Sequence, residues 1–322
     1  MEGHDKAMRE LVEISPPDIE PYRNGNTGIE YVTSFRAGKP GPHVLVSALV
    51  HGNELCGALA LDYFFRQGIR PARGELTLAF VNVAAMRRFD PAKPGLSRYV
   101  DEDFNRLWST EVLASVSRQS VELRRARQLR QVVDRADLLL DLHSMQTRCP
   151  PLILSGRLEK GLDLARSLGS PQHIVRDRGH DAGKRMRDYD GFDDPASPRA
   201  ALLVECGPHW QRDTVDVAID TMFRFLTAAG TIEAATAEPH LRLIPPPSQT
   251  VIEVSGPYTV KSKNFRFSTD YAGLEAIEKA GTVIGYDGKD PVTTPFDDCV
   301  LIMPSRNLKP GMTAVRFGRI AG

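Results

Sequence analysis

A histidine and a glutamate three residues apart, His51 and Glu54, follow an apolar run and precede an amphipathic stretch. They are therefore expected where a strand ends and a helix begins, which is where open α/β sheets bind ligands. Imidazole and carboxylate together suit zinc, and Gly52 between them permits a tight backbone. The same spacing often arises by chance in a helix cap or a surface pair, so this motif alone does not establish a metal site.

A second histidine, His143, follows the apolar run of residues 138–140, with Asp141 two positions before it. Strand periodicity places both side chains on one face of the strand. His143 is a candidate third ligand, and Asp141 could accept the free ring N–H of a metal-bound histidine. A hydrogen-bonded Asp–His pair in the core is the alternative interpretation.

An apolar strand over residues 200–204 leads into Glu205. A carboxylate in such a position costs free energy unless it is used or paired. Near a water activated by zinc, Glu205 could act as general base and then return the proton to a leaving nitrogen. A structural salt bridge to one of the many arginines is the alternative.

Arginines flank the charged segment of residues 98–106, which lies between an expected strand and a long helix and is therefore expected to be a loop. Arg98 or Arg106 could polarise a carbonyl, stabilise an oxyanion or bind a substrate carboxylate. An ordinary surface loop is the alternative, because the acidic residues 101–103 could neutralise both arginines.

Short apolar runs alternate with amphipathic stretches over the first two-thirds of the chain, which predicts an α/β fold. The expected strands are residues 43–49, 76–82, 138–142, 152–154 and 200–204. The expected helices cover about residues 54–67, 112–135 and 213–228.

The composition shifts after Gly230, and short β-prone runs at residues 281–286, 300–303 and 313–317 are separated by turn residues. We expect two domains, an α/β domain over residues 1–235 and a small all-β domain over residues 236–322.

The bulk composition is that of an ordinary globular protein, with 41% apolar and 25% charged residues. Basic and acidic residues number 41 each, which leaves no net positive charge to attract nucleic acid. No apolar stretch reaches the length of a membrane span, the polar residues 1–5 do not resemble a signal peptide, and the four cysteines are scattered. We therefore expect a cytoplasmic protein with no nucleic-acid or membrane partner, and a homo-oligomer stays an open alternative.

Four motifs occur in order over residues 43–209: H-G-N-E, R-Y-V-D-E-D-F-N-R, D-L-H and V-E-C-G. Together they resemble the succinylglutamate desuccinylase and aspartoacylase family of zinc carboxypeptidase-like deacylases. The resemblance implies a carboxypeptidase-like mixed sheet flanked by helices, with a small all-β domain at the C-terminus. It also implies one zinc ion per chain and a small N-acyl amino acid, or a related amide, as the substrate.

The resemblance also implies a role for individual residues of this chain. His51, Glu54 and His143 would be the zinc ligands, and Glu205 would be the catalytic glutamate. Arg98 would polarise the scissile carbonyl, while Asn105 and Arg106 would bind the carboxylate of the amino-acid part.

Members of this family also use an arginine to bind the second carboxylate of the substrate. In this chain Arg187 is the best candidate for that arginine, with Arg199 second. The expected activity is hydrolysis of a linear amide by a zinc-dependent deacylase. A zinc carboxypeptidase acting on peptides and a non-catalytic protein that binds zinc or carboxylates are the alternatives.

Overall fold

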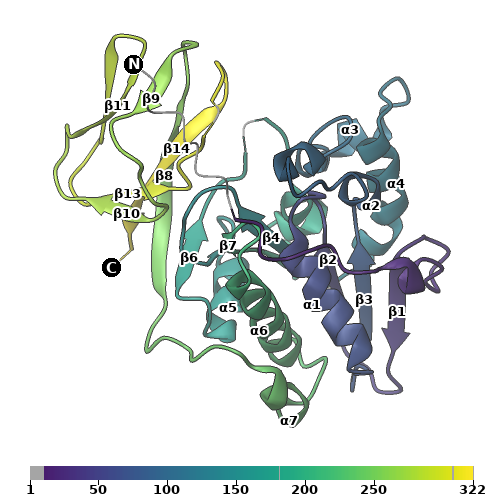
Figure 1. Cartoon of the computed structure of the whole chain (residues 1–322). Helices are drawn as coiled ribbons and strands as arrows, with labels where there is room; N and C mark the ends of the chain where they lie inside the picture. Colours follow the sequence, from purple (N-terminus) through teal and green to yellow (C-terminus); the bar gives the residue numbers. More distant parts are fainter. Residues whose placement is uncertain (1–10, 181, 307, 322) are drawn as a thin grey trace.

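The computed structural model describes residues 11–180, 182–306 and 308–321, and its main feature is one mixed sheet (Figure 1). This sheet has eleven strands in the order β1-β3-β2-β4-β7-β5-β6-β8-β14-β13-β10, and a second sheet has the order β12-β11-β9. The strands of the large sheet are β1 (Val32–Arg36), β2 (His43–Ala48), β3 (Glu75–Phe80), β4 (Leu138–Met145), β5 (Leu152–Leu154), β6 (His173–Arg176), β7 (Ala200–Pro208), β8 (Thr250–Thr259), β10 (Glu275–Ile277), β13 (Cys299–Ile302) and β14 (Thr313–Ile320). The strands of the small sheet are β9 (Phe265–Phe267), β11 (Val283–Asp287) and β12 (Asp290–Thr293).

Helices cover the N-terminal part of the large sheet. The α-helices are α1 (Leu55–Arg66), α2 (Val83–Met86), α3 (Thr110–Ala114), α4 (Val121–Val133), α5 (Glu159–Leu168), α6 (Asp213–Ala228) and α7 (Ala234–Ala237). Short 3-10 helices are η1 (Glu20–Tyr22), η2 (Pro94–Ser97), η3 (Phe104–Arg106), η4 (Met186–Asp188), η5 (Asp190–Phe192) and η6 (Glu238–His240).

The central strands are apolar on both faces, as expected for strands with a helix layer on each side. In β2, Val44 and Val46 join the apolar cluster that contains side chains of α1, α5 and α6. Leu45 between them joins the opposite cluster, which contains side chains of α4. This alternation explains why the expected strands read as nearly continuous apolar runs.

Three parallel strands deliver the candidate residues to one edge of the sheet. β4 pairs in parallel with both β2 and β7, and its register with β7 matches His143 with Glu205. The turn after β2 carries His51 and leads into α1, for which Glu54 is the N-terminal flanking residue. The carboxyl ends of these strands therefore meet where the sequence places His51, Glu54, His143 and Glu205.

One expected helix is wrong as stated, because residues 112–135 do not form a single helix. α3 ends at Ala114 and α4 begins at Val121, with a non-helical segment between them. The Ser120 hydroxyl accepts a hydrogen bond from the backbone N–H of Leu123 at 2.9 Å, which starts a new helix there.

The C-terminal strands continue the large sheet. β8 pairs with β6 in parallel and with β14 in antiparallel orientation, so the ladder runs unbroken from one part of the chain into the other. The expected fold class, a mixed α/β sheet flanked by helices with a small antiparallel sheet in the C-terminal part, is confirmed. The domain boundary at residue 235 stays a prediction.

None of the helices in the described ranges has the length and apolar character needed to cross a membrane. Residues 1–5, used above to argue for the cytoplasm, lie outside those ranges.

Candidate active site

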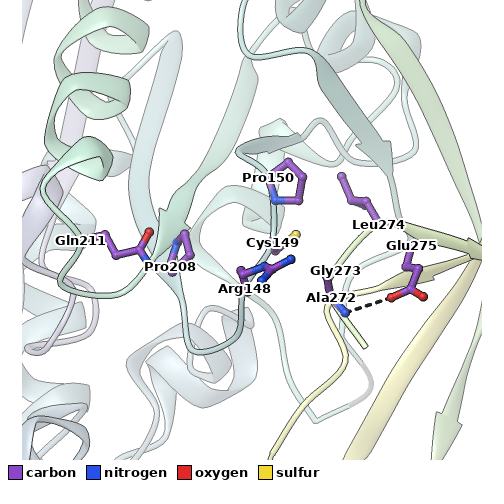
Figure 2. Close-up of a pocket in the computed structure, with 9 residues that line it drawn as sticks. All are labelled: Arg148, Cys149, Pro150, Pro208, Gln211, Ala272, Gly273, Leu274 and Glu275. Atoms are coloured by element: carbon purple, nitrogen blue, oxygen red, sulfur yellow. Dashed lines mark hydrogen bonds between the residues drawn. The ribbon is translucent and has the colours of Figure 1, made fainter. Parts of the chain in front are cut away.

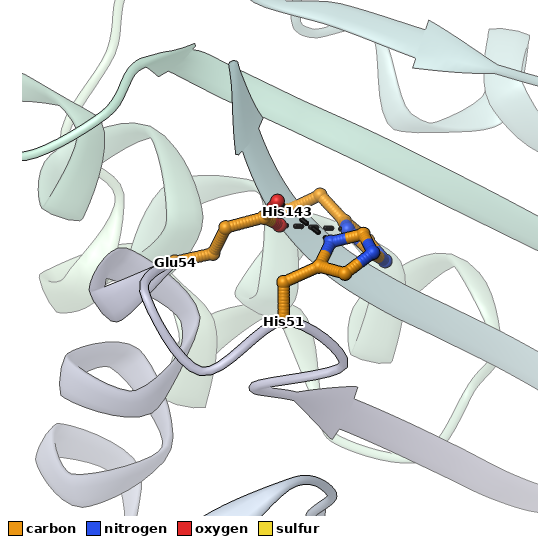
Figure 3. Close-up of side chains that lie close together, drawn as sticks. All are labelled: His51, Glu54 and His143. Carbon is orange, nitrogen blue, oxygen red and sulfur yellow. Dashed lines mark hydrogen bonds and ion pairs between the residues drawn. The ribbon is translucent and has the colours of Figure 1, made fainter. Parts of the chain in front are cut away.

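Two imidazoles and a carboxylate from distant parts of the chain converge at the sheet edge (Figure 3). One ligand atom from each of His51, Glu54 and His143 lies within 4.8 Å of the others, and all three side chains are buried. The Glu54 carboxylate is 2.7 Å from Nδ1 of His51 through Oε1 and 2.7 Å from Nδ1 of His143 through Oε2. Gly52 is required in this turn because a Cβ there would lie 2.3 Å from the backbone nitrogen of Met86.

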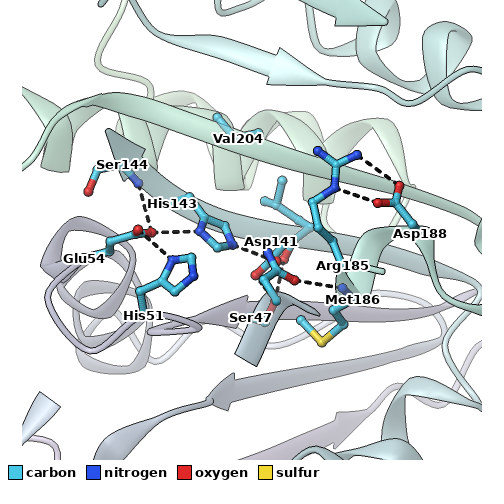
Figure 4. A network of polar contacts seen from close by, with 12 residues as sticks. Ser47, His51, Glu54, Asp141, His143, Ser144, Arg185, Met186, Asp188 and Val204 are labelled. Carbon is cyan, nitrogen blue, oxygen red and sulfur yellow. Dashed lines mark hydrogen bonds and ion pairs between the residues drawn. The ribbon is translucent and has the colours of Figure 1, made fainter. Parts of the chain in front are cut away.

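The other ring nitrogen of each histidine faces a carboxylate. Nε2 of His143 lies 2.8 Å from Asp141, which also accepts a hydrogen bond from the Ser47 hydroxyl at 2.7 Å (Figure 4). Nε2 of His51 lies 3.1 Å from Asp103 and 2.9 Å from the guanidinium of Arg98. Carboxylates in these positions fix the ring orientation and turn both Nδ1 atoms toward a shared point, as around a bound metal.

The ionisable groups of this cluster shift one another's pKa values. Burial raises the pKa of Glu54, but the two histidines outweigh this and hold the pKa well below its usual range. Burial lowers the pKa of His143, but the charges of Asp141 and Glu54 outweigh that and raise the pKa well above its usual value. Two nitrogen donors and one oxygen donor, enclosed and held by carboxylates, form a donor set that fits a divalent ion such as zinc.

Glu205 lies on β7 beside His143 and has no structural salt bridge in the described part of the chain. Its side chain is buried, and its Oε2 atom has no hydrogen-bond partner among the described residues. Burial, and then the negative charge of Glu54, raises the pKa of Glu205 to about 8. A buried carboxylate without a partner costs free energy, which favours a chemical role for it over a structural one.

Arg98 joins the cluster from the charged loop. Its guanidinium contacts Oε1 of Glu54 at 3.3 Å and Oδ2 of Asp103 at 3.2 Å. Burial lowers the pKa of Arg98, but the charges of Asp103 and Glu54 outweigh this and raise it. The cation is thus held within reach of the metal-binding cluster, in a position to stabilise negative charge that develops there.

Asn105 and Arg106 follow Asp103 in the same loop. The side-chain oxygen of Asn105 accepts a hydrogen bond from the backbone N–H of Met186 at 2.8 Å. The guanidinium of Arg106 donates to the backbone carbonyl of Asn105 at 2.7 Å. Burial lowers the pKa of Arg106 against the opposing charge of Asp103, so this arginine lies near the cluster in a partly enclosed setting.

Arg187 is not brought to the cluster. Its guanidinium pairs with Asp188 at 2.6 Å and donates to the carbonyls of Ser155 and Ala201 at 2.9 and 3.1 Å. Ala201 lies near the start of β7, four residues before Glu205, at the opposite end of the strand. The assignment of Arg187 to a second substrate carboxylate stays a prediction that these contacts do not favour.

The alternative, Arg199, is also engaged elsewhere, because it donates to the carbonyls of Ala136 and Val133 and pairs with Asp190. Arg185, on the same segment as Arg187, pairs with Asp177 and Asp188, as Figure 4 shows for Asp188. These buried ion pairs hold the segment that carries Met186 against Asn105.

A groove lies beside this edge, between the ends of β4 and β7 and the start of β10 (Figure 2). Its wall includes Cys149, whose thiol pKa is raised to about 12 by burial and then by the charge of Glu205. The thiol therefore stays protonated at neutral pH and is not a nucleophile. Arg148 and Glu275 also line this groove, so its walls carry both signs of charge.

Glu122 was not singled out from the sequence, yet it anchors the loop that carries Arg98 and Asp103. Its fully buried carboxylate accepts hydrogen bonds from the backbone N–H groups of Val100, Asp101 and Glu102 at 2.7, 3.1 and 3.3 Å. The amide of Asn82 donates to the same carboxylate at 3.0 Å. The loop is thereby fixed to the first turn of α4.

Replacing Glu122 with glutamine is expected to lower kcat by about tenfold to a hundredfold, since a shift of about 1 Å in the loop misplaces Arg98 and Asp103. The amide would present an N–H group to backbone donors and leave at least one of them unpaired. The unfolding free energy should also fall by about 1–3 kcal/mol, as measured by denaturant titration.

Asp220 provides the matched control, because it is a fully buried carboxylate on α6 that accepts hydrogen bonds from the backbone of Arg242 and Leu243 at 2.9 and 3.0 Å. Asp220→Asn should lose similar stability and keep kcat unchanged. Equal losses of kcat in both variants would reduce Glu122 to a general stabilising residue.

Comparison with known proteins gives the same family as the motifs. Residues 40–228, more than half of the chain, match the succinylglutamate desuccinylase/aspartoacylase catalytic domain. Over 125 residues the chain is 27% identical to the N-acyl-aromatic-L-amino acid amidohydrolase (carboxylate-forming) of Rattus norvegicus. That match covers 36% of this chain and only 38% of the rat protein.

Solved structures share the fold over nearly the whole chain. The succinylglutamate desuccinylase/aspartoacylase of Rhodobacter sphaeroides has a TM-score of 0.66 at 17% identity, covering 96% of this chain and 94% of that one. The product-bound ectoine utilization protein of Ruegeria pomeroyi has a TM-score of 0.61 at 14% identity, covering 91% and 92%. At these identities the likeness shows the fold, and the domain match shows the family. The chain belongs to the succinylglutamate desuccinylase/aspartoacylase family.

Proposed function

We propose that this protein is a zinc-dependent deacylase that hydrolyses the amide bond of a small N-acylated amino acid or a related amine. The observation that carries the proposal is the buried His51–Glu54–His143 cluster, with one ligand atom from each within 4.8 Å of the others. Beside it lies Glu205, whose Oε2 atom has no hydrogen-bond partner among the described residues. Membership of the family and the likeness to a rat amidohydrolase support amide hydrolysis as the reaction.

His51 and His143 would hold the zinc ion through Nδ1, and Glu54 through its carboxylate. Three protein ligands are the number found in catalytic zinc sites, whereas structural sites use four. Bound there, zinc would supply Lewis-acid polarisation of the amide carbonyl and would lower the pKa of a water molecule. Asp141 and Asp103 would keep the two imidazoles in the tautomer and orientation that binding requires.

Glu205 would accept a proton from the attacking water and later donate it to the leaving nitrogen. With zinc bound nearby, the pKa of Glu205 that burial raises would fall, which would leave the carboxylate ionised and able to accept this proton. The Oε2 atom has no hydrogen-bond partner among the described residues, which supports this role. Arg98 would stabilise the negative charge that develops on the carbonyl oxygen. Asn105 and Arg106 would bind the carboxylate of the amino-acid part.

A metal assay combined with a substrate panel tests this proposal. We expect one zinc ion per chain, and a kcat/KM of at least about 10⁴ M⁻¹ s⁻¹ for the best N-acyl amino acid. Tight stoichiometric zinc without hydrolysis of any amide would instead support a non-catalytic binding protein. Faster release of C-terminal residues from unmodified peptides than from N-acyl amino acids would support a carboxypeptidase.

A further inference from the structure

A second groove borders the metal-binding cluster, on the side of the turn after β2. Its buried lining residues are Asn53, His209 and Trp210, which we call the floor, and its exposed lining residues include Lys93, Gln146 and Arg306, which we call the rim. Among the lining residues the charged side chains are the two basic ones, Lys93 and Arg306. None of the candidate catalytic residues lines this groove, so it offers room for a part of the substrate away from the scissile bond.

The floor is tied directly to the proposed zinc ligands. Asn53 immediately precedes Glu54 in the chain. Nδ1 of His209 is 2.7 Å from the hydroxyl of Ser144, which follows His143, and the backbone N–H of Ser144 donates to Glu54 at 3.3 Å. These links through Ser144 and through the chain itself place the floor next to the metal-binding cluster.

The floor carries polar atoms that the protein does not satisfy. Asn53 is 0% exposed, and neither Oδ1 nor Nδ2 of its side chain has a hydrogen-bond partner within the described ranges. His209 is 5% exposed, and its Nε2 atom also has no hydrogen-bond partner in those ranges. Buried polar groups are nearly always paired, so three unpaired atoms on two residues that line one groove point to a ligand that completes them.

The unpaired atoms specify the chemistry of that ligand. Asn53 offers one donor and one acceptor side by side, and burial lowers the pKa of His209 to about 4, which leaves its ring uncharged at neutral pH. A carboxylate only accepts hydrogen bonds, so it would leave Oδ1 of Asn53 buried without a donor. An amide group supplies both a C=O for Nδ2 and an N–H for Oδ1.

The rim cations do not reverse this preference. Lys93 is exposed, and Arg306 is half-exposed and already paired with Asp270 at 2.9 Å. Exposed ion pairs change binding by only about fivefold or less. An unsatisfied buried acceptor weakens binding by about fivefold to a hundredfold. The hydrogen bonds to Asn53 therefore determine the preference for an amide over a carboxylate.

We propose that Asn53 and His209 form the subsite for the acyl half of the substrate and select acyl groups that carry a second, uncharged amide. This inference rests on the proposed deacylase function. Asn53 makes a two-point contact with the amide, and Nε2 of His209 makes a third hydrogen bond to it. Hydrolysis then gives an amide-bearing carboxylic acid and a free amine, with one water consumed.

Three N-acyl derivatives of one amino acid test the subsite. The amino acid is the one whose N-acyl derivative is hydrolysed fastest in the substrate panel described above. The three derivatives carry an acetyl, a succinyl or a succinamoyl group, of which the last two have the same length and differ only in a terminal carboxylate or amide. We expect kcat/KM for the succinamoyl derivative to exceed that for the succinyl derivative by about tenfold. Equal values, or a preference for succinyl, would overturn the proposal.

Variants assign the preference to residues. Asn53→Leu should reduce the succinamoyl-to-succinyl ratio to about one, because neither amide contact remains. Arg306→Gln is the control at the rim and should not lower the ratio, because a cation there favours the charged succinyl group over the uncharged amide. If Asn53→Leu fails to fold or to bind zinc, His209→Phe serves as the second test and should lower the ratio several-fold. A ratio unchanged in the folded floor variant would overturn the proposal.

Calorimetry with the released acids separates this inference from the proposed function. Succinamic acid should bind the zinc-loaded protein about tenfold more tightly than succinate. If no derivative is hydrolysed but this order of binding holds, the deacylase proposal fails and the subsite stands. If hydrolysis occurs and succinate binds as tightly as succinamic acid, the subsite assignment fails and the deacylase stands.

Discussion

Replacing Glu205 with glutamine is expected to lower kcat by about 10²–10⁴-fold, the usual range for loss of a general base. Glutamine has the same size as glutamate and cannot take a proton from water at neutral pH. Because the proposed zinc ligands His51, Glu54 and His143 are untouched, the variant should keep one zinc ion per chain. Steady-state kinetics on the best substrate and metal analysis of the same preparation measure both quantities.

Protein stability provides the control for this result. Glu205 is buried and has no hydrogen-bond partner for Oε2 among the described residues. Replacing this carboxyl group with a neutral amide of the same size should leave the melting temperature unchanged or raise it. Inactivity with intact stability and zinc content would therefore locate the defect in the proton transfer. A fully active Glu205→Gln variant would remove Glu205 from the mechanism.

Removal of the metal by a chelator is expected to abolish hydrolysis, and added zinc should restore it. The zinc-loaded protein should also be more stable than the metal-free protein, by about 4 kcal/mol when free zinc is a thousand times the dissociation constant. The physical reason is that the folded chain holds the three ligand groups within 4.8 Å of one another, whereas the unfolded chain separates them. Thermal unfolding with and without zinc measures this difference.

A pair of histidine variants makes the metal prediction specific. His143→Ala should lose both zinc and activity, because it removes one of the three ligands. His173→Ala is the control, since His173 lies on β6 outside the cluster. Activity that survives complete removal of metal would contradict the zinc-dependent proposal.

The sequence predicts much of this site because its geometry follows from strand order. Three apolar runs end in a candidate residue, and parallel neighbours bring their carboxyl ends together at one edge of the sheet. The pairing of β4 with β7 accordingly places His143 beside Glu205, and the turn after β2 brings Glu54 to within 2.7 Å of His143. The four motifs also identify the family, which the match over residues 40–228 confirms.

Residues that act through loop geometry could not be predicted in the same way. Asp101, Glu102 and Asp103 are three successive acids, and only the folded loop shows that Asp103 contacts His51 while Asp101 accepts from the backbone of Val121. Glu122 belongs to α4, a helix rich in arginine, so its sequence surroundings suggest an exposed side chain. The structure shows instead that the Glu122 carboxylate is buried. The residues around Arg187 show no strand or helix periodicity. The sequence therefore could not predict how far Arg187 lies from the metal-binding cluster.

The pairing of β8 with β6 and β14 limits how a substrate can enter. Arg306 follows β13 in this same sheet and reaches the rim of the second groove. A hinge motion that swung the C-terminal strands away from β6 would have to break a ladder of backbone hydrogen bonds. We therefore expect access to the metal-binding cluster to come from local shifts of the connections around the two grooves, while the strand pairing of the sheet stays intact.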